Sequence, residues 1–476
     1  MNKEQVCYIS ACEMADKIRS QELTSLEIIE TIVERIEKIN PIINAYCTPT
    51  FDIARDMASK ADKAVKTSRN GENLGLLHGI PTSIKDLETT KGIRTTLGCK
   101  IYENFIPKRD SIIVKRIKDA GAIILGKTNT PSLGYKGVTD NLIFGVTKNP
   151  WNLEKTCGGS SGGAAAAVAS GLGPLASGSD GGGSIRIPSS FCGVFGLKPN
   201  FGRVPHEDMK VVGSLGTLVH KGPIVRYVED AALMLDVLAG EHYLDRYSLP
   251  KPNYSYLEKL YELPNYLKIG FSFDLGFAKA LDPEVEKAVM KAIEKFEKFN
   301  WLIEKSDIKL QEALNTHWIL WTTSFAHRLK PYLDQWKDKL DPQLIEVVKI
   351  GLNYSVDNIK WAEIQREMVY EEISRFFNNF DILITPTLAC SSFDLDLQFP
   401  NIIDGKEVNP GAWLPFTYPF NLSGHPAASI PCGWSDEGVP IGMQIVGKRL
   451  DELLVLQVSK AFEEIAPWQD KKPIFN

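Results

Sequence analysis

The sequence has few cysteines and histidines, and neither type is arranged to bind a metal. Its 476 residues include eight cysteines and seven histidines, with no CxxC pair, no HExxH motif and no cysteine–histidine spacing suited to zinc. We therefore expect no metal site and no other cofactor. Scattered cysteines are typical of a reducing compartment, so the expected location is the cytoplasm.

Long apolar runs and blocks of like charge are absent as well. The stretch nearest to a membrane span, residues 164–176, is shorter than the roughly 20 residues needed to cross a bilayer and contains Pro174. The 54 basic and 59 acidic residues are interspersed, with a formal net charge of -5. We expect neither membrane nor nucleic acid as a partner. The N-terminus lacks the basic-then-apolar order of a signal peptide, and we interpret it as mature sequence.

What is present is an ordinary globular composition, 43% hydrophobic and 24% charged, in a chain long enough to bury a large core. Short apolar runs alternate with helical patterns, as in the predicted strand 80–84, helix 111–120 and strand 122–125. This rhythm indicates an α/β fold. The simplest interpretation is a single domain over residues 1–476, with an N-terminal helical layer over about 1–65, a catalytic core over about 70–240 and a candidate cap over about 300–420.

Several individual elements can be predicted. Thr24 and Glu27 form a capping box before a helix that is expected to end before Pro41. The segment Ala313–Leu329 is aromatic and apolar, which is typical of core or of the wall of an apolar pocket, and we favour core. Further predicted helices cover 229–240, 283–299 and 453–465, and further strands cover 267–271, 381–385, 427–431 and 439–446.

The most informative stretch combines glycine and serine. Gly181, Gly182, Gly183 and Ser184 place consecutive amides in a loop with almost no side chains, so the loop can surround one anionic oxygen. We predict an oxyanion hole formed by these four amides. Ser184 is the candidate nucleophile, because its hydroxyl lies beside the donors that would stabilise the product of its own attack.

A serine hydroxyl needs a base to become a good nucleophile at neutral pH. No histidine lies near this loop, but Ser160 and Ser161 occupy a second glycine-rich loop upstream, across an alanine-rich segment predicted to be helical. Lys85 follows the predicted strand 80–84, and a desolvated lysine can be neutral and basic. These positions favour a relay in which Lys85 takes a proton from Ser184 by way of Ser160.

At these positions the sequence resembles the amidase signature family. The matching stretches are Gly79–Leu87, Gly158–Gly163, Gly178–Arg186, Phe191–Pro199, Lys127–Pro131, Ile384–Thr387 and Asn421–Ala427. The resemblance implies a large mixed central β-sheet surrounded by many α-helices, the catalytic set Lys85, Ser160 and Ser184, and a cis peptide bond involving Ser160. It also implies hydrolysis of small-molecule amides to a carboxylate and ammonia or an amine through an acyl-enzyme on Ser184, in a protein that is often a homodimer.

Other interpretations are open at this point. The nearest is the glutaminase subunit of a tRNA-dependent amidotransferase, which shares these residues but differs where this chain has Ile187 and where it has Pro205 and His206. A dinucleotide-binding protein is suggested by a GxGxxA match at 171–176, although a helix rather than a strand is predicted before it. A catalytically silent scaffold is disfavoured by the intact set. The sequence does not choose among aryl, aliphatic, amino-acid and cyclic amides, or exclude esters and carbamates.

Overall fold

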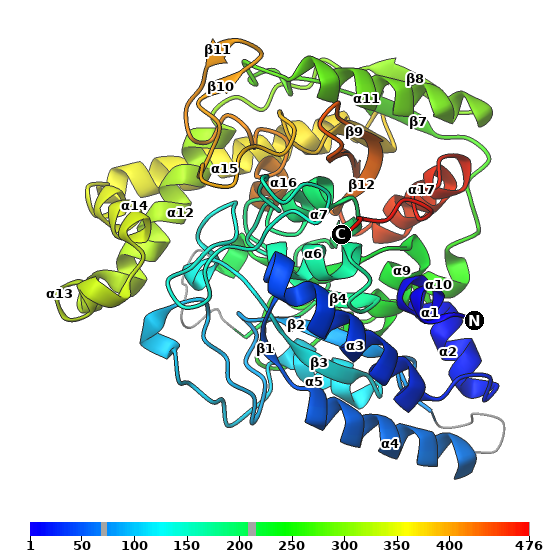
Figure 1. The fold of residues 1–476 in the computed structure, drawn as a ribbon. Coiled ribbons are helices and arrows are strands. Elements are labelled where there is room, and N and C mark those ends of the chain that lie inside the picture. Colours follow the sequence, from blue (N-terminus) through cyan, green and yellow to red (C-terminus); the bar gives the residue numbers. More distant parts are fainter. Residues whose placement is uncertain (68–73, 208–215, 476) are drawn as a thin grey trace.

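The alternation of short apolar strands with helices builds one large sheet (Figure 1). A computed structural model describes residues 1–67, 74–207 and 216–475. Its described strands are β1 (Tyr46–Pro49), β2 (Pro81–Lys85), β3 (Ile123–Thr128), β4 (Leu175–Asp180), β5 (Phe195–Lys198), β6 (His220–Val225), β7 (Lys268–Phe271), β8 (Leu302–Lys305), β9 (Ile382–Pro386), β12 (Ala427–Trp434) and β13 (Pro440–Gly447), with a separate hairpin of β10 (Ile402–Ile403) and β11 (Lys406–Glu407).

The strand order in the eleven-stranded sheet is β1-β3-β2-β4-β6-β5-β12-β13-β9-β7-β8. Pairing is parallel from β3 through β2 to β4 and from β9 through β7 to β8, and antiparallel at β1 and from β4 across to β9. The predicted α/β class with a large mixed central sheet is confirmed.

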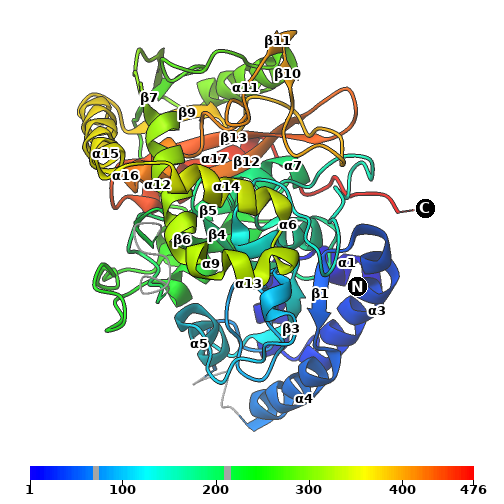
Figure 2. The same ribbon diagram turned by 90° about the vertical axis from the view of Figure 1, so that its left-hand side faces the viewer.

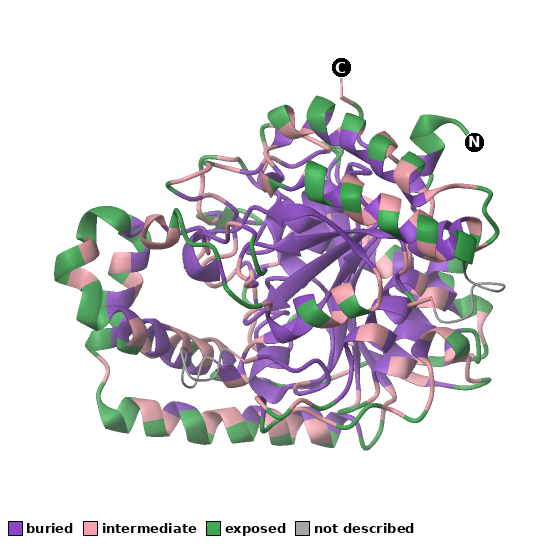
Figure 3. Ribbon diagram, turned by 90° about the horizontal axis from the view of Figure 1, so that it is seen from below, coloured by how far each residue is buried: buried purple, intermediate pink, exposed green. Residues whose placement is uncertain are grey.

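Helices surround this sheet, and Figure 3 shows buried strands at the centre of helices whose outer faces are exposed. The described α-helices are α1 (Lys3–Tyr8), α2 (Ala11–Arg19), α3 (Ser25–Ile43), α4 (Phe51–Thr67), α5 (Ile112–Asp119), α6 (Gly162–Ala169), α7 (Arg186–Cys192), α9 (Val228–Leu238), α10 (Tyr256–Lys259), α11 (Pro283–Lys295), α12 (Ala313–Leu329), α13 (Leu333–Trp336), α14 (Pro342–Leu352), α15 (Val356–Phe376), α16 (Pro419–Ser423) and α17 (Glu452–Ile465). In Figure 2, α12 and α14 lie in front of the sheet. None of the described helices combines the length and apolar character needed to cross a bilayer.

The predicted elements are found close to their expected positions, with one correction in α3. This helix begins after the predicted capping box of Thr24 and Glu27, but it runs through Pro41 to Ile43. Proline in the last turn removes only one backbone donor, which a helix end tolerates better than its interior. The helix ends where Asn44 adopts the left-handed conformation, with φ of 53°.

Helix α6 connects the two serine-containing loops and is fully buried. Its small side chains let it pack directly against neighbouring backbone: a Cβ on Gly163 would lie 2.4 Å from the Asn129 nitrogen and 2.6 Å from the Ala45 oxygen. The 171–176 stretch forms the turn from α6 into β4. This helix-to-strand order is the reverse of a dinucleotide-binding turn, so that alternative is wrong.

We predict that Gly163→Ala destabilises the protein. In an exposed helix this change would stabilise by about 1 kcal/mol, but here the methyl group meets backbone atoms that cannot rotate away, and overpacking typically costs about 1–3 kcal/mol. Chemical unfolding of the wild type and the variant measures the difference. An unchanged or increased free energy of unfolding would contradict this account of α6.

Candidate active site

Lys85 is the last residue of β2, and its side chain is 0% exposed. Its amine nitrogen lies 2.7 Å from Ser160 Oγ, 2.8 Å from Ser161 Oγ and 3.0 Å from Ser179 Oγ. Lys85 forms no ion pair with any described residue. Three hydroxyl groups therefore surround a buried amine where a carboxylate would be expected to pair with a lysine cation.

This environment favours the neutral amine. Burial, with help from the positive charge of Lys221, lowers the pKa of Lys85 well below its usual value, while Glu88 and Asp180 oppose the shift. Lys221 itself forms a buried ion pair with Glu88. The amine at position 85 thus differs from the charged, solvated side chain that most lysines present.

The two serine-containing loops meet beside this amine. The Gly159–Ser160 peptide bond is cis, as the resemblance implied. The Ser161 amide donates to the Ser184 carbonyl oxygen at 3.1 Å, which joins the loops directly. Ser160 and Ser184 both line a cavity of about 250 Å³. The structure therefore gathers Lys85, Ser160 and Ser184 around one cavity.

Apolar side chains form most of the cavity wall, among them Leu87, Leu97, Leu133, Val219 and Trp321. Trp321 comes from α12, the segment expected to be core. That expectation holds for Ile319, Leu320 and Phe325, which are buried. It fails for Trp321, because this face of the helix turns toward the cavity.

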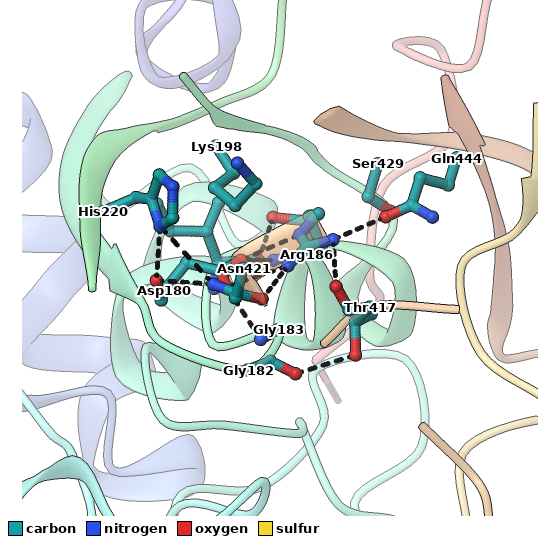
Figure 4. A network of polar contacts seen from close by, with 12 residues as sticks. Asp180, Gly182, Gly183, Arg186, Lys198, His220, Thr417, Asn421, Ser429 and Gln444 are labelled. Carbon is teal, nitrogen blue, oxygen red and sulfur yellow. Dashed lines mark hydrogen bonds and ion pairs between the residues drawn. The ribbon is translucent and has the colours of Figure 1, made fainter. Parts of the chain in front are cut away.

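The loop from 181 to 184 is fixed by a buried carboxylate (Figure 4). Asp180 Oδ1 accepts from the Gly183 amide at 2.7 Å, and Oδ2 accepts from the Ile185 amide at 3.2 Å. The Arg186 guanidinium donates to both oxygens of Asp180 at 2.9 Å. The side-chain amide of Asn421 donates to Asp180 Oδ1 at 2.8 Å. The bracing role expected for Asp180 and Arg186 is visible in these contacts.

Charge balance explains why this carboxylate is stable without water. Burial alone would raise the pKa of Asp180, but Arg186 and Asn421 outweigh it and hold the pKa well below its usual range. Arg186 uses its remaining donors on the Thr417 carbonyl oxygen at 2.9 Å and on Gln444 Oε1 at 2.7 Å. The loop is thereby tied to residues more than two hundred positions away in the sequence.

The peptide groups of the loop are held differently on their two sides. The carbonyl oxygen of Gly181 accepts from His317 at 3.0 Å, and that of Gly182 accepts from the Thr417 hydroxyl at 2.7 Å. The amides of Gly181, Gly182 and Ser184 donate to no described residue, whereas that of Gly183 is engaged by Asp180. Within the described structure, three of the four amides predicted for the oxyanion hole can thus bind an incoming oxygen.

Among the described residues, one group could share a metal ion, namely Cys12, Glu229 and Asp230. None of them lines the cavity, and Asp230 already accepts from the Cys12 amide at 3.1 Å. All eight cysteines are free thiols. The site is thus built from hydroxyls, amides and one amine.

Residues 27–456 match the amidase family model. The chain belongs to the amidase family. It is therefore a hydrolase of amides, and the fold and activity that the motifs implied are confirmed.

Relatives agree with this assignment over their full length. An acylamidase from Rhodococcus erythropolis is 38% identical over 99% of this chain and 98% of its own. The glutaminase-type chain of the glutamyl-tRNA(Gln) amidotransferase of Thermodesulfovibrio yellowstonii is 34% identical over 97% of this chain and 98% of its own. Sequence similarity thus extends both to an amidase and to a component of an amidotransferase.

Solved structures show the same fold. A bacterial aryl acylamidase of the amidase signature enzymes is 31% identical with a TM-score of 0.90, covering 97% of each chain. The 6-aminohexanoate cyclic dimer hydrolase is 29% identical with a TM-score of 0.88, covering 98% of this chain and 99% of that one. Amidases named for different substrates therefore share this architecture.

We predict that Asp180→Asn destabilises the protein by about 3–5 kcal/mol, because it leaves the buried Arg186 cation without its partner. The folded-state pKa of Asp180 is depressed, so its contribution is complete above the unfolded value of about 3.9 and is lost as pH falls toward the folded value. The gap in unfolding free energy between wild type and variant should narrow below about pH 4.

The matched control is Asp119→Asn, which removes an exposed ion pair with Lys115 on α5 and should hardly change stability. Urea unfolding of the three proteins at several pH values measures both effects. A gap that does not narrow in acid would contradict the ionised state of Asp180.

Proposed function

We propose that this chain hydrolyses amides that carry an apolar acyl or aryl group, by way of an acyl-enzyme on Ser184 and a relay through Ser160 to Lys85. The observation that carries the proposal is the buried Lys85 amine, 2.7 Å from Ser160 Oγ and without a carboxylate partner among the described residues. A lysine in such a place is a base rather than a cation.

In the first half of the reaction, Ser184 Oγ forms a bond to the amide carbon. Its proton passes to Ser160 as the Ser160 proton passes to the lone pair of Lys85. When the carbon–nitrogen bond breaks, the leaving amine takes this proton back along the relay. Water then attacks the acyl-enzyme with the same proton movements and releases the carboxylate. The relay ends the cycle in its starting state.

Charge on the carbonyl oxygen develops where the available amides of Gly181, Gly182 and Ser184 converge. Gly183 was expected to share this role, but its amide is directed to Asp180 Oδ1 at 2.7 Å. We therefore assign the oxyanion hole to the other three. Loss of a single donor of this kind typically costs about 2.7–4 kcal/mol of transition-state stabilisation.

The apolar wall supports the proposed substrate class. Leu97, Leu133 and Trp321 line the same cavity as Ser184, and apolar groups gain free energy when such walls remove them from water. The similar proteins named as an acylamidase and an aryl acylamidase support the same class. Because Trp321 lies within residues 300–420, we propose that this region acts as the cap that shapes the acyl site.

Two expectations complete the proposal. We place the enzyme in the cytoplasm, where eight free thiols stay reduced. A homodimer is the assembly that the family resemblance suggests.

The glutaminase component of a tRNA-dependent amidotransferase is the second candidate, supported by several relatives of 33–35% identity that are named as part of such an enzyme. Release of ammonia from glutamine in preference to neutral anilides, or copurification of partner subunits, would favour it. Equal or better hydrolysis of anilides by the isolated chain favours the amidase.

We predict that Ser184→Ala abolishes hydrolysis of p-nitroacetanilide, and that Lys85→Ala nearly does so, because nucleophile and base act as a unit. A fluorophosphonate probe should label the wild type at Ser184 and leave Ser184→Ala unlabelled. Absorbance of released p-nitroaniline and mass spectrometry of the labelled peptide measure the two effects. Wild-type turnover in either variant would refute the relay.

We also predict how pH dependence responds to charges near Lys85. The rise of kcat/KM with pH follows loss of the Lys85 proton and should occur well below the usual lysine range, because the pKa of Lys85 is lowered. Lys221→Met removes a positive charge that lowers this pKa, so the rise should move to higher pH.

Glu88→Gln is the matched control, because Glu88 raises the pKa of Lys85 and its neutralisation should move the rise to lower pH. Profiles of kcat/KM for the three enzymes test the pair of shifts. Movement of both variants in one direction would show that another group controls the profile.

A further inference from the structure

Helix α12 contributes a histidine that contacts the oxyanion loop from outside the cavity. His317 Nε2 lies 3.0 Å from the Gly181 carbonyl oxygen. Burial lowers the pKa of His317 to about 4, so the imidazole is neutral near pH 7 and one nitrogen carries hydrogen. Because a carbonyl oxygen can only accept, that hydrogen is on Nε2. The contact fixes the tautomer of the ring.

Aromatic neighbours hold the imidazole in this position. Its ring is stacked on Trp321, with centroids 5.4 Å apart, and on Tyr418, also at 5.4 Å. Stacked rings restrict rotation of the histidine about its side-chain bonds. The Nε2 hydrogen is therefore directed at the loop before any substrate arrives.

The glycines of the loop are matched to these side chains. A Cβ on Gly182 would lie 2.9 Å from the His317 ring, and a Cβ on Gly181 would lie 2.7 Å from the Trp321 ring. Real Cβ atoms do not approach other atoms so closely, so any larger residue would displace α12 or the loop. The loop and the helix fit each other only because both positions are glycine.

Peptide geometry then gives the contact a consequence for catalysis. In a planar trans peptide, the carbonyl of Gly181 and the amide of Gly182 point in opposite directions. A carbonyl anchored by His317 turns the Gly182 amide away from the imidazole. The next peptide is fixed on both sides by Thr417 and Asp180, whereas the peptide that His317 holds has an amide without a described partner.

We infer that His317 is a positioning residue, which orients the Gly182 amide toward the oxyanion. The inference rests on the proposed function, because it assigns a role within the same oxyanion hole. Preorganised donors stabilise a transition state without reorganisation, so a loop that can rotate this peptide should lose part of that stabilisation.

Two variants separate the hydrogen bond from the packing. His317→Phe keeps an aromatic ring between Trp321 and Tyr418 but removes the donor, and His317→Gln supplies a side-chain amide that can donate to Gly181. On p-nitroacetanilide we expect His317→Phe to lower kcat by about 10- to 100-fold, less than outright loss of a donor, with KM little changed. His317→Gln should restore much of this loss.

Tyr418→Phe is the matched control, because it keeps the other stacked ring and removes a hydroxyl that has no described partner. It should leave kcat near the wild-type value. Melting temperatures of all variants establish whether they remain folded.

A trifluoromethyl ketone, which forms an oxyanion on the enzyme, provides a readout that packing alone would not change. Its Ki should rise in His317→Phe in parallel with the loss of kcat/KM, while the Ki of a non-hydrolysable ground-state analogue stays constant. A folded His317→Phe enzyme with wild-type kcat and ketone affinity would overturn the inference. That result would leave the relay intact, whereas turnover by Ser184→Ala would refute the relay itself.

Discussion

A lysine amine enclosed by hydroxyl groups is the constraint on which the rest of this structure depends. A charged amine is costly to bury without a carboxylate, and Lys85 has three serine oxygens within 3.0 Å instead. The surrounding architecture keeps water and acids away from it. It lies at the end of a strand flanked by β3 and β4, and a helix of glycine, alanine and valine closes the space beside it. Basicity at this point is a property of the sheet as much as of the residue.

A second, opposite arrangement stabilises the loop that faces this amine. Asp180 and Arg186 are both buried, but each is fully paired, and the carboxylate also receives backbone amides. The ion pair therefore acts as an internal scaffold that selects which peptide groups point inward. The structure thus keeps one ionisable group neutral and another charged within the same site, because one lacks a counterion and the other has several donors.

Much of the fold and of the site could be predicted from the sequence, where information is local. The capping box at Thr24, the strand before Lys85 and the glycine-rich loops depend on neighbours within a few positions. Long-range contacts could not be predicted. Asn421 lies 241 residues from the Asp180 that it contacts, and only its place in a family motif pointed to it.

Other features lacked any distinguishing signal. Ser179 resembles any serine in a strand until the fold places it on Lys85. Engagement of the Gly183 amide depends on the path of the loop, which four consecutive small residues leave open. Trp321 and Phe325 are both aromatic and four residues apart, yet only the first faces the cavity. A periodic pattern gives the face of a helix but not what that face meets.

The spacing of His317 and Trp321 on α12 has an evolutionary consequence. One helical turn carries both the wall of the acyl site and the contact to the nucleophile loop. A change that shifts this helix to admit a bulkier substrate also moves the imidazole away from Gly181. Broadening of substrate range through α12 is therefore linked to slower chemistry, and new specificities in this lineage should arise more readily from the cavity walls that do not touch the loop, such as Leu97 and Leu133.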